Sequence, residues 1–116
     1  MTVWVRADPG GAKNFGVCLL SGAAVRTWCV SCADEAINVV LQHSSEEPSG
    51  VGVDAPLWWS AGRSSDRVAD RWIRKTYKLS GGQVQSVNSL RGAALAQSML
   101  FVEGVRRRYP SVRVTE

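Results

Sequence analysis

The sequence is poor in the side chains that most often mark a metal or catalytic site. It has a single histidine, His43, and an odd number of cysteines, Cys18, Cys29 and Cys32. Cys29 and Cys32 have the spacing of a zinc or redox pair, but no second pair follows, so we expect no such role. Cys18 is predicted to fill the core, and His43, near a predicted helix end, is interpreted as a surface residue.

Long hydrophobic runs are also missing. No apolar segment approaches the ~20 residues of a membrane-spanning helix, and the N-terminus lacks the pattern of a signal peptide. We therefore expect no membrane partner and a cytoplasmic location. The length of 116 residues and the hydrophobic content of 45% are typical of one globular domain, predicted to span residues 1–116.

The apolar pattern predicts an α/β fold with a mixed five-stranded sheet and helices packed on it. The first three strands, joined by short turns, form an antiparallel meander, at residues 4–7, 15–20 and 24–30. A buried strand follows at 51–54, and the last one lies at 112–116. A helix precedes the strand at 51–54, so that strand can run parallel to the first.

Helical spacing of apolar residues separates the later strands. A helix is predicted at residues 32–43, with Ser31 as its N-cap, and a basic helix at about 66–78. A third begins at Asn88 or Ser89 and ends at the basic run of residues 106–108, where positive charge favours a helix C-terminus.

Three of the predicted strands end on a carboxylate: Asp8, Asp54 and Glu116. Asp8 and Asp54 are each followed closely by a proline, which cannot continue a central strand. If the first and fourth strands are parallel neighbours, these two carboxylates meet at the carboxyl edge of the sheet, where α/β folds bind ligands. Adjacent carboxylates repel unless a cation lies between them, and hard oxygen ligands suit Mg²⁺ or Mn²⁺.

Positive charge is concentrated in one segment. Residues 63–78 carry a net charge of +4, equal to that of the whole chain. The basic residues in question are Arg63, Arg67, Arg71, Arg74, Lys75 and Lys78. This concentration favours contact with a phosphate backbone, although an amphipathic helix with a solvated face explains the pattern equally.

The order of strands and helices, with Asp ending the first and fourth strands, resembles the ribonuclease-H-like fold. More closely, the chain resembles a family of uncharacterised proteins predicted to be nucleases of that fold. The matching segments are residues 7–9, 53–57, 67–74, 91–95 and 114–116. They span nearly the whole chain in the expected order.

The resemblance implies a Mg²⁺-dependent (or Mn²⁺-dependent) centre that hydrolyses phosphodiester bonds of nucleic acid. It implies that Asp8, Asp54 and Glu116 hold the metal and that Asp70 is a further catalytic candidate. Arg67, Arg71 and Arg74 would bind phosphates, with Arg63 and Lys75 adding charge to the same segment. Trp58 and Trp59 would stack on a base, or would instead anchor the core or a loop.

The chain departs from the family's pattern after Glu116. In the family, the last strand is followed by a further segment with additional helices, which this sequence does not include. We therefore expect a weakly held Glu116 and a bare sheet face that favours a homodimer.

Two other functions are compatible with the same residues. A non-catalytic module of this fold would use the basic helix to bind nucleic acid or a protein partner. A nucleotide-phosphate site of the actin or sugar-kinase type would use the Gly-rich turn at residues 8–14 as a phosphate cradle.

Overall fold

The computed structural model describes residues 2–57, 66–81, 83 and 92–116. The chain divides into two compact units. The first, here called the sheet unit, consists of Met1–Leu57 and Gly92–Glu116; the second, here called the α2 unit, consists of Trp58–Arg91.

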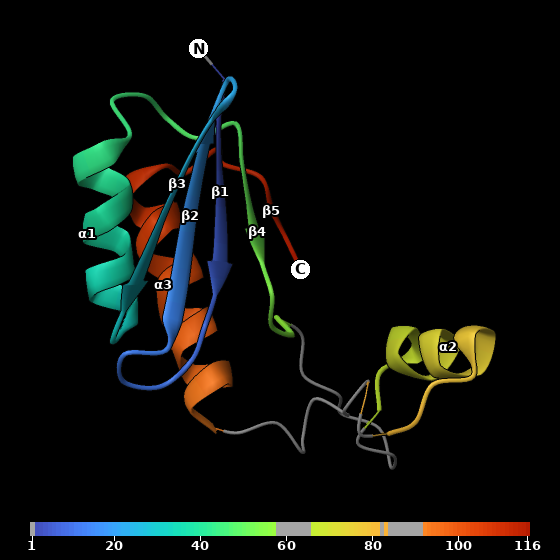
Figure 1. Ribbon diagram of the computed structural model, residues 1–116. Helices are drawn as coiled ribbons and strands as arrows, with labels where there is room; N and C mark the ends of the chain where they lie inside the picture. The colour runs from blue at the N-terminus through green and yellow to red at the C-terminus, as the bar shows by residue number, and fades with distance from the viewer. Residues whose placement is uncertain (1, 58–65, 82, 84–91) are drawn as a thin grey trace. The chain divides into compact units, whose positions relative to one another are not determined.

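The sheet unit is built on a mixed five-stranded sheet with the strand order β3-β2-β1-β4-β5 (Figure 1). The strands are β1 (Val3–Asp8), β2 (Phe15–Ser21), β3 (Ala24–Val30), β4 (Gly50–Val53) and β5 (Val114–Thr115). β1, β2 and β3 form the predicted antiparallel meander, and β4 runs parallel to both β1 and β5. The α/β class and the mixed sheet predicted from the sequence are therefore confirmed.

Helices α1 (Ala33–His43) and α3 (Gly92–Arg108) lie together on one face of this sheet (Figure 1). The N-cap of α1 is Cys32, not Ser31 as predicted, and the Cys32 side chain makes no capping hydrogen bond. The Ala33 N–H at this end donates to the side-chain carbonyl of Gln97 at 2.7 Å. The Ser31 backbone N–H instead donates to the Glu35 carboxylate at 2.8 Å. The predicted start of α3 at Asn88 or Ser89 lies outside the described residues.

The core forms because alternate strand residues face the two helices. Val3, Val5 and Ala7 of β1 are buried, while the residues between them are exposed. Phe15 of β2 and Phe101 of α3, both fully buried, meet with ring centroids 5.7 Å apart. Because side chains alternate along each strand, the sheet has an apolar face under the helices and a second face that carries the exposed residues.

The second sheet face carries apolar as well as charged side chains that are exposed. Trp4, Leu20 and Val25 lie opposite one another on β1, β2 and β3, and are 52%, 37% and 61% exposed. Cys18 of β2, predicted to fill the core, is instead half-buried and lies on this second face, because Val17 and Leu19 occupy the core positions. The homodimer that such a face would favour stays a prediction.

In the α2 unit, helix α2 (Val68–Tyr77) is shorter than the predicted 66–78. Arg67 is its N-cap, and Lys78 ends it in the left-handed conformation with a φ of 52°. Two large apolar residues of this helix, Val68 and Trp72, are 75% and 59% exposed. The Trp72 and Tyr77 rings meet edge to face at 6.2 Å.

None of the helices in the described ranges is long and apolar enough to span a bilayer.

Two adjacent residues of α3 test where the core lies. Phe101→Ala removes a fully buried ring that packs on Phe15, and should lower the free energy of unfolding by about 3–5 kcal/mol. Leu100→Ala, at a position that is 59% exposed, should change it by less than about 0.5 kcal/mol. Urea unfolding of both variants measures the difference, and equal losses would contradict this assignment of the core.

Candidate functional site

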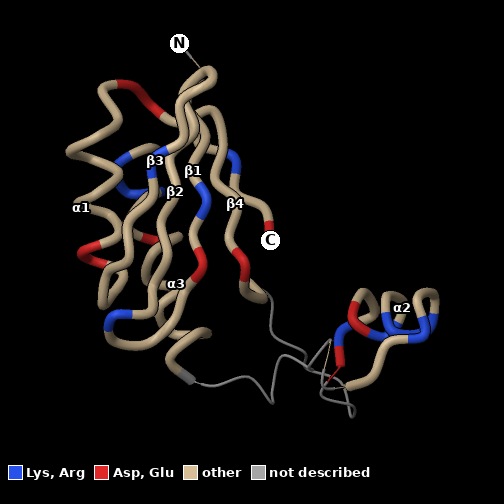
Figure 2. The backbone as a smooth tube through the Cα atoms, viewed as in Figure 1, with Lys and Arg blue, Asp and Glu red and all other residues tan. Residues whose placement is uncertain are grey.

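The strongest candidate site lies at the carboxyl ends of β1 and β4. Ala7 pairs with Val53 in the parallel ladder, and the Asp54 N–H donates to the Ala7 carbonyl at 2.8 Å. The next step of this register puts Asp8 beside Asp54. Figure 2 shows an acidic segment at the end of β1 and another at the end of β4. Adjacent strands are about 4.8 Å apart, so the two Asp backbones are direct neighbours.

The local sequence explains why both carboxylates face the same way. Ala7 and Val53 are buried in the core, so the residues that follow them point to the opposite, exposed side of the sheet. Pro9 and Pro56 follow closely and end the strands. The sequence-based expectation that Asp8 and Asp54 share one edge of the sheet therefore agrees with the strand register.

A basic side chain of β1, that of Arg6, reaches across to the acidic residue that follows β4. The Arg6 guanidinium is 3.4 Å from the Asp54 carboxylate, and both side chains are 65% exposed. Arg6 is two residues before Asp8 on β1, so it lies on the same face. Arg6 was not predicted to be a site residue from the sequence, although the alternation of side chains along β1 places it on the same face as Asp8.

The depression beside Asp8 extends across β1, β2 and β3. It has a volume of about 180 Å³, and its lining includes Arg6, Asp8, Gly16, Cys18 and Thr27. Gly16 lies opposite Asp8 in the antiparallel ladder. Because glycine has no side chain, the sheet is open next to the Asp8 carboxylate.

Glu116 lies near this edge but makes a different contact. Its carboxylate accepts a hydrogen bond from the Leu57 N–H at 2.6 Å, which joins the end of the chain to the turn after Asp54. Within the described ranges, no three His, Cys, Asp or Glu side chains form a group that could hold a metal ion. The role of Glu116 as a third metal ligand stays a prediction.

Asp70, the fourth predicted acidic residue, is bound within its own helix. It accepts hydrogen bonds from the backbone N–H and from the guanidinium of Arg67, at 3.2, 2.9 and 2.8 Å. These hydrogen bonds from Arg67 lower the pKa of the Asp70 carboxyl, against the opposing effect of burial. In this arrangement Asp70 stabilises the start of α2.

The basic residues of α2 fall into two groups. Arg67 and Arg74 form ion pairs with Asp70 and Asp66, and their side chains are largely buried. Arg71 and Lys75 are exposed. The sequence could not distinguish the paired basic residues from the exposed ones, because both groups occur at helical spacing in the same segment. The other three predicted nucleic-acid-binding residues, Trp58, Trp59 and Arg63, lie outside the described residues.

The Gly-rich turn between β1 and β2 is closed by its own contacts. The Asn14 N–H donates to the Gly11 carbonyl at 2.9 Å, and the Lys13 N–H donates to the Ser31 hydroxyl at 3.2 Å. The Lys13 carbonyl accepts from the Cys29 thiol at 3.0 Å. These N–H groups are therefore already engaged, which leaves them unavailable to cradle a phosphate.

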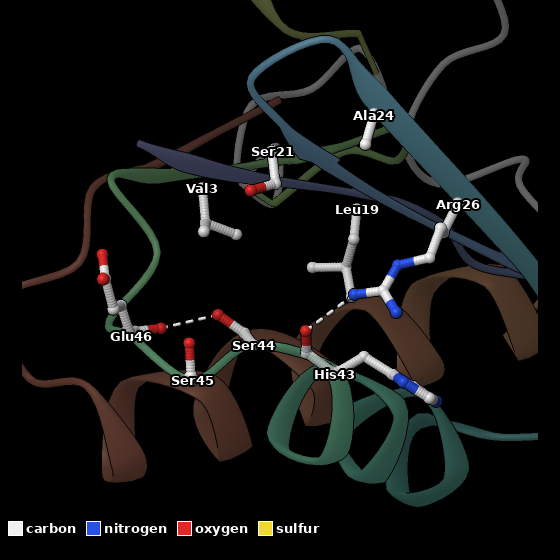
Figure 3. Close-up of a pocket in the computed structure, with 9 residues that line it drawn as sticks. All are labelled: Val3, Leu19, Ser21, Ala24, Arg26, His43, Ser44, Ser45 and Glu46. Atoms are coloured by element: carbon white, nitrogen blue, oxygen red, sulfur yellow. Dashed lines mark hydrogen bonds between the residues drawn. The ribbon is translucent and has the colours of Figure 1, made fainter. Parts of the chain in front are cut away.

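A further pocket, of about 360 Å³, lies at the opposite end of β1, beside Val3 (Figure 3). Arg26 donates to the carbonyl of His43 at 2.9 Å and so binds the C-terminal end of α1. The buried Ser44 hydroxyl donates to the Glu46 carbonyl at 2.6 Å. His43 is exposed and stacks on Trp28 at 4.7 Å, in line with its interpretation as a surface residue. The contacts here hold the helix end in place.

The Arg67–Asp70 pair should make the stability of α2 depend on pH. A carboxyl whose pKa is lowered in the folded state contributes fully above its unfolded pKa, near 3.9, and loses this contribution as the pH falls below it. Asp70→Asn should therefore reduce the protection of α2 amides at neutral pH by about 1 kcal/mol. The difference between the two proteins should shrink as the pH is lowered from neutral to about 3, because the stabilising charge of Asp70 is lost progressively below the unfolded pKa.

Hydrogen exchange measured on both proteins at each pH tests this expectation. Asp34→Asn, at an exposed position in the first turn of α1, is the matched control and should leave the α2 amides unchanged. A difference at the α2 amides that is equally large at both pH values would contradict the proposed origin in the Asp70 charge.

Comparisons with known proteins were made with family models, curated proteins and solved structures, and no match to this chain was found. The function is therefore inferred from the geometry of the chain's own residues.

Proposed function

We propose that the chain is a metal-dependent nuclease that hydrolyses phosphodiester bonds of nucleic acid. The observation that carries this proposal is the adjacency of Asp8 and Asp54 at the carboxyl ends of the parallel strands β1 and β4. Two exposed carboxylates on neighbouring strands repel each other, which is unfavourable without a cation. Such a pair is better explained by ion binding than by a contribution to folding.

The donor set fits Mg²⁺ or Mn²⁺. Mg²⁺ keeps several of its waters and is commonly bound by one or two carboxylates together with substrate phosphates. Asp8 and Asp54 would supply those carboxylates, and Glu116, at the nearby edge, is the candidate for a further ligand. When bound, the ion would lower the pKa of a water and stabilise negative charge on the phosphoryl oxygens.

Several residues outside the pair have complementary roles in this proposal. Arg6 neutralises Asp54 in the absence of an ion, and its exposed guanidinium can turn to a substrate phosphate once an ion binds. Arg71 and Lys75 of α2 add further exposed positive charge for the nucleic acid backbone. Asp70 and its partner Arg67 maintain the start of that helix.

We further propose that the sheet unit has the ribonuclease-H-like fold. The order of elements supports this: an antiparallel meander, a helix, a parallel strand, further helices and a last parallel strand. The acidic residues at the ends of the first and fourth strands are at the positions that the resemblance implies. The order of elements supports the proposed fold only. The proposed activity is argued from the pair Asp8 and Asp54.

Removing either carboxylate should abolish the activity. Asp8→Asn and Asp54→Asn each replace an exposed anionic ligand by a neutral one of the same shape. Mg²⁺-dependent cleavage of labelled single-stranded and duplex DNA and RNA should fall at least about 100-fold. Asp34→Asn, an equivalent change on α1, should retain full activity.

The fold should survive these changes, because both side chains are exposed. Circular dichroism and urea unfolding check this point. Cleavage that persists in both variants would remove the proposal. Binding in EDTA with a steep salt dependence, but with no cleavage by the wild type, would support the non-catalytic module instead.

Arg6 offers a second test that does not require catalysis. If Arg6 and the ion compete for Asp54, Arg6→Gln should tighten Mn²⁺ binding severalfold, because a repelling positive charge is removed. The free energy of unfolding should change by less than about 1 kcal/mol, as for other exposed ion pairs. Calorimetric titration with Mn²⁺ measures the first quantity, and weaker binding by the variant would contradict the proposed competition.

A further inference from the structure

A second groove of the sheet unit lies along β4, next to β5. Its volume is about 730 Å³, and its lining includes Trp4, Gly50, Gly52, Arg106, Arg113 and Thr115. This volume is within the range of small-molecule and cofactor sites. The groove is separate from the depression beside Asp8, although both reach the same sheet.

Two glycines of β4 shape the floor of this groove: Gly52 leaves open space, and Gly50 lets the Trp4 ring approach the backbone. Gly52 lies between Arg6 of β1 and Thr115 of β5 in the ladders, and a Cβ added to it would meet no atom within 4 Å. Gly50 lies opposite Trp4, and a Cβ there would come within 2.5 Å of the Trp4 ring. The indole is therefore held against the Gly50 backbone, while 52% of Trp4 remains exposed.

The charge of the groove selects an anionic occupant. Arg106 and Arg113 are both exposed, and none of the described residues that line the groove is acidic. A fixed, half-exposed indole binds planar rings by stacking, and arginines bind phosphates. A nucleotide presents a planar ring and a phosphate at once, and therefore matches both features.

We propose that this groove binds one nucleotide of a single-stranded nucleic acid, with its base on Trp4 and its phosphates at Arg113 and Arg106. The strand must be single, because a base in a duplex is already stacked on both faces. This inference rests on the proposed function and names its substrate class. Gly52 is two residues before Asp54 on β4, or about 7 Å, so a strand in the groove leads to the acidic pair.

Binding measured in EDTA tests the groove without cleavage. The probes are fluorescein-labelled oligothymidine and oligouridine of about 12 nucleotides, and the measurement is fluorescence anisotropy. Trp4→Ala removes the stacking surface and should raise Kd about tenfold. Gly52→Val should raise Kd to a similar extent, because a Cβ at this position meets no atom within 4 Å and valine suits a strand, so the added side chain occupies the groove.

Further variants separate the contributions. Arg113→Gln should lower the slope of log K against log salt by about one. Leu100→Ala, an exposed apolar residue of α3 outside the groove, should leave Kd within about twofold. Asp8→Asn should retain binding in EDTA while losing cleavage, so failure of the nuclease proposal and failure of this one are distinguishable.

The result that would overturn the inference is an unchanged Kd in both Trp4→Ala and Gly52→Val, or no binding of either probe by the wild type. A wild type that binds duplex as tightly as single strands, with the same dependence on Trp4, would also overturn it. Self-association that Gly52→Val abolishes, in the absence of oligonucleotide binding, would show that a second copy of the chain occupies the groove.

Discussion

The parallel pairing of β1 with β4 is the constraint on which the candidate site depends. These strands are separated by the meander and by α1, and only their pairing brings Asp8 and Asp54 to one edge. The pairing is maintained by burial of Val5, Ala7, Val51 and Val53 under the helices. The apolar side of the sheet thus positions a charged group on the other side, since alternate residues of a strand face opposite ways.

The second sheet face, formed by the alternate residues that point away from the helices, carries two kinds of surface. Toward the carboxyl end of β1 the side chains are charged, with Asp8, Asp54 and Arg6 together. Toward its amino end they are apolar and aromatic, with Trp4 beside Leu20. In the proposed function, the charged end would meet the backbone of a nucleic acid strand and the aromatic end would meet its bases.

In the α2 unit, ion pairs reduce the positive charge that the sequence suggests is available to a partner. Counted from the sequence, residues 66–78 have basic side chains at helical spacing. In the structure, Arg67 and Arg74 are paired with Asp70 and Asp66, and the carboxylates lower the charge available to a partner. The exposed cations, Arg71 and Lys75, are therefore the better candidates for contact with phosphate.

Glu116 and Asp70 illustrate why a strand-end or helix acid is not automatically a ligand. Each carboxylate accepts hydrogen bonds from the chain itself, Glu116 from the Leu57 N–H and Asp70 from Arg67. A carboxylate satisfied by protein donors has less reason to bind an ion than one facing another carboxylate. Asp54 also has a protein partner, the exposed Arg6 at 3.4 Å, so in the proposed function an ion at Asp8 and Asp54 has to displace that contact.

The sequence by itself predicted the five strands in their order along the chain, the helix α1 and the α/β class, because burial at a period of two or 3.6 residues is a local property of the chain. The last strand, predicted at 112–116, is shorter and spans Val114–Thr115. It also placed Asp8 and Asp54 at strand ends, since Pro9 and Pro56 mark those ends. The boundaries of α2 and the N-cap of α1 differed from prediction, because hydrogen bonds at helix ends depend on neighbours such as Glu35 and Asp70.

Only the tertiary structure decided which side chains meet across the sheet. The contact of Arg6 with Asp54, the indole of Trp4 against Gly50, and the hydrogen bond from Leu57 to Glu116 join residues far apart in the chain. Strand register sets these contacts, and a shift of one residue would move every side chain to the other face. A single sequence carries the alternation within each strand but not the register between strands, so the site's neighbours could not be read from it.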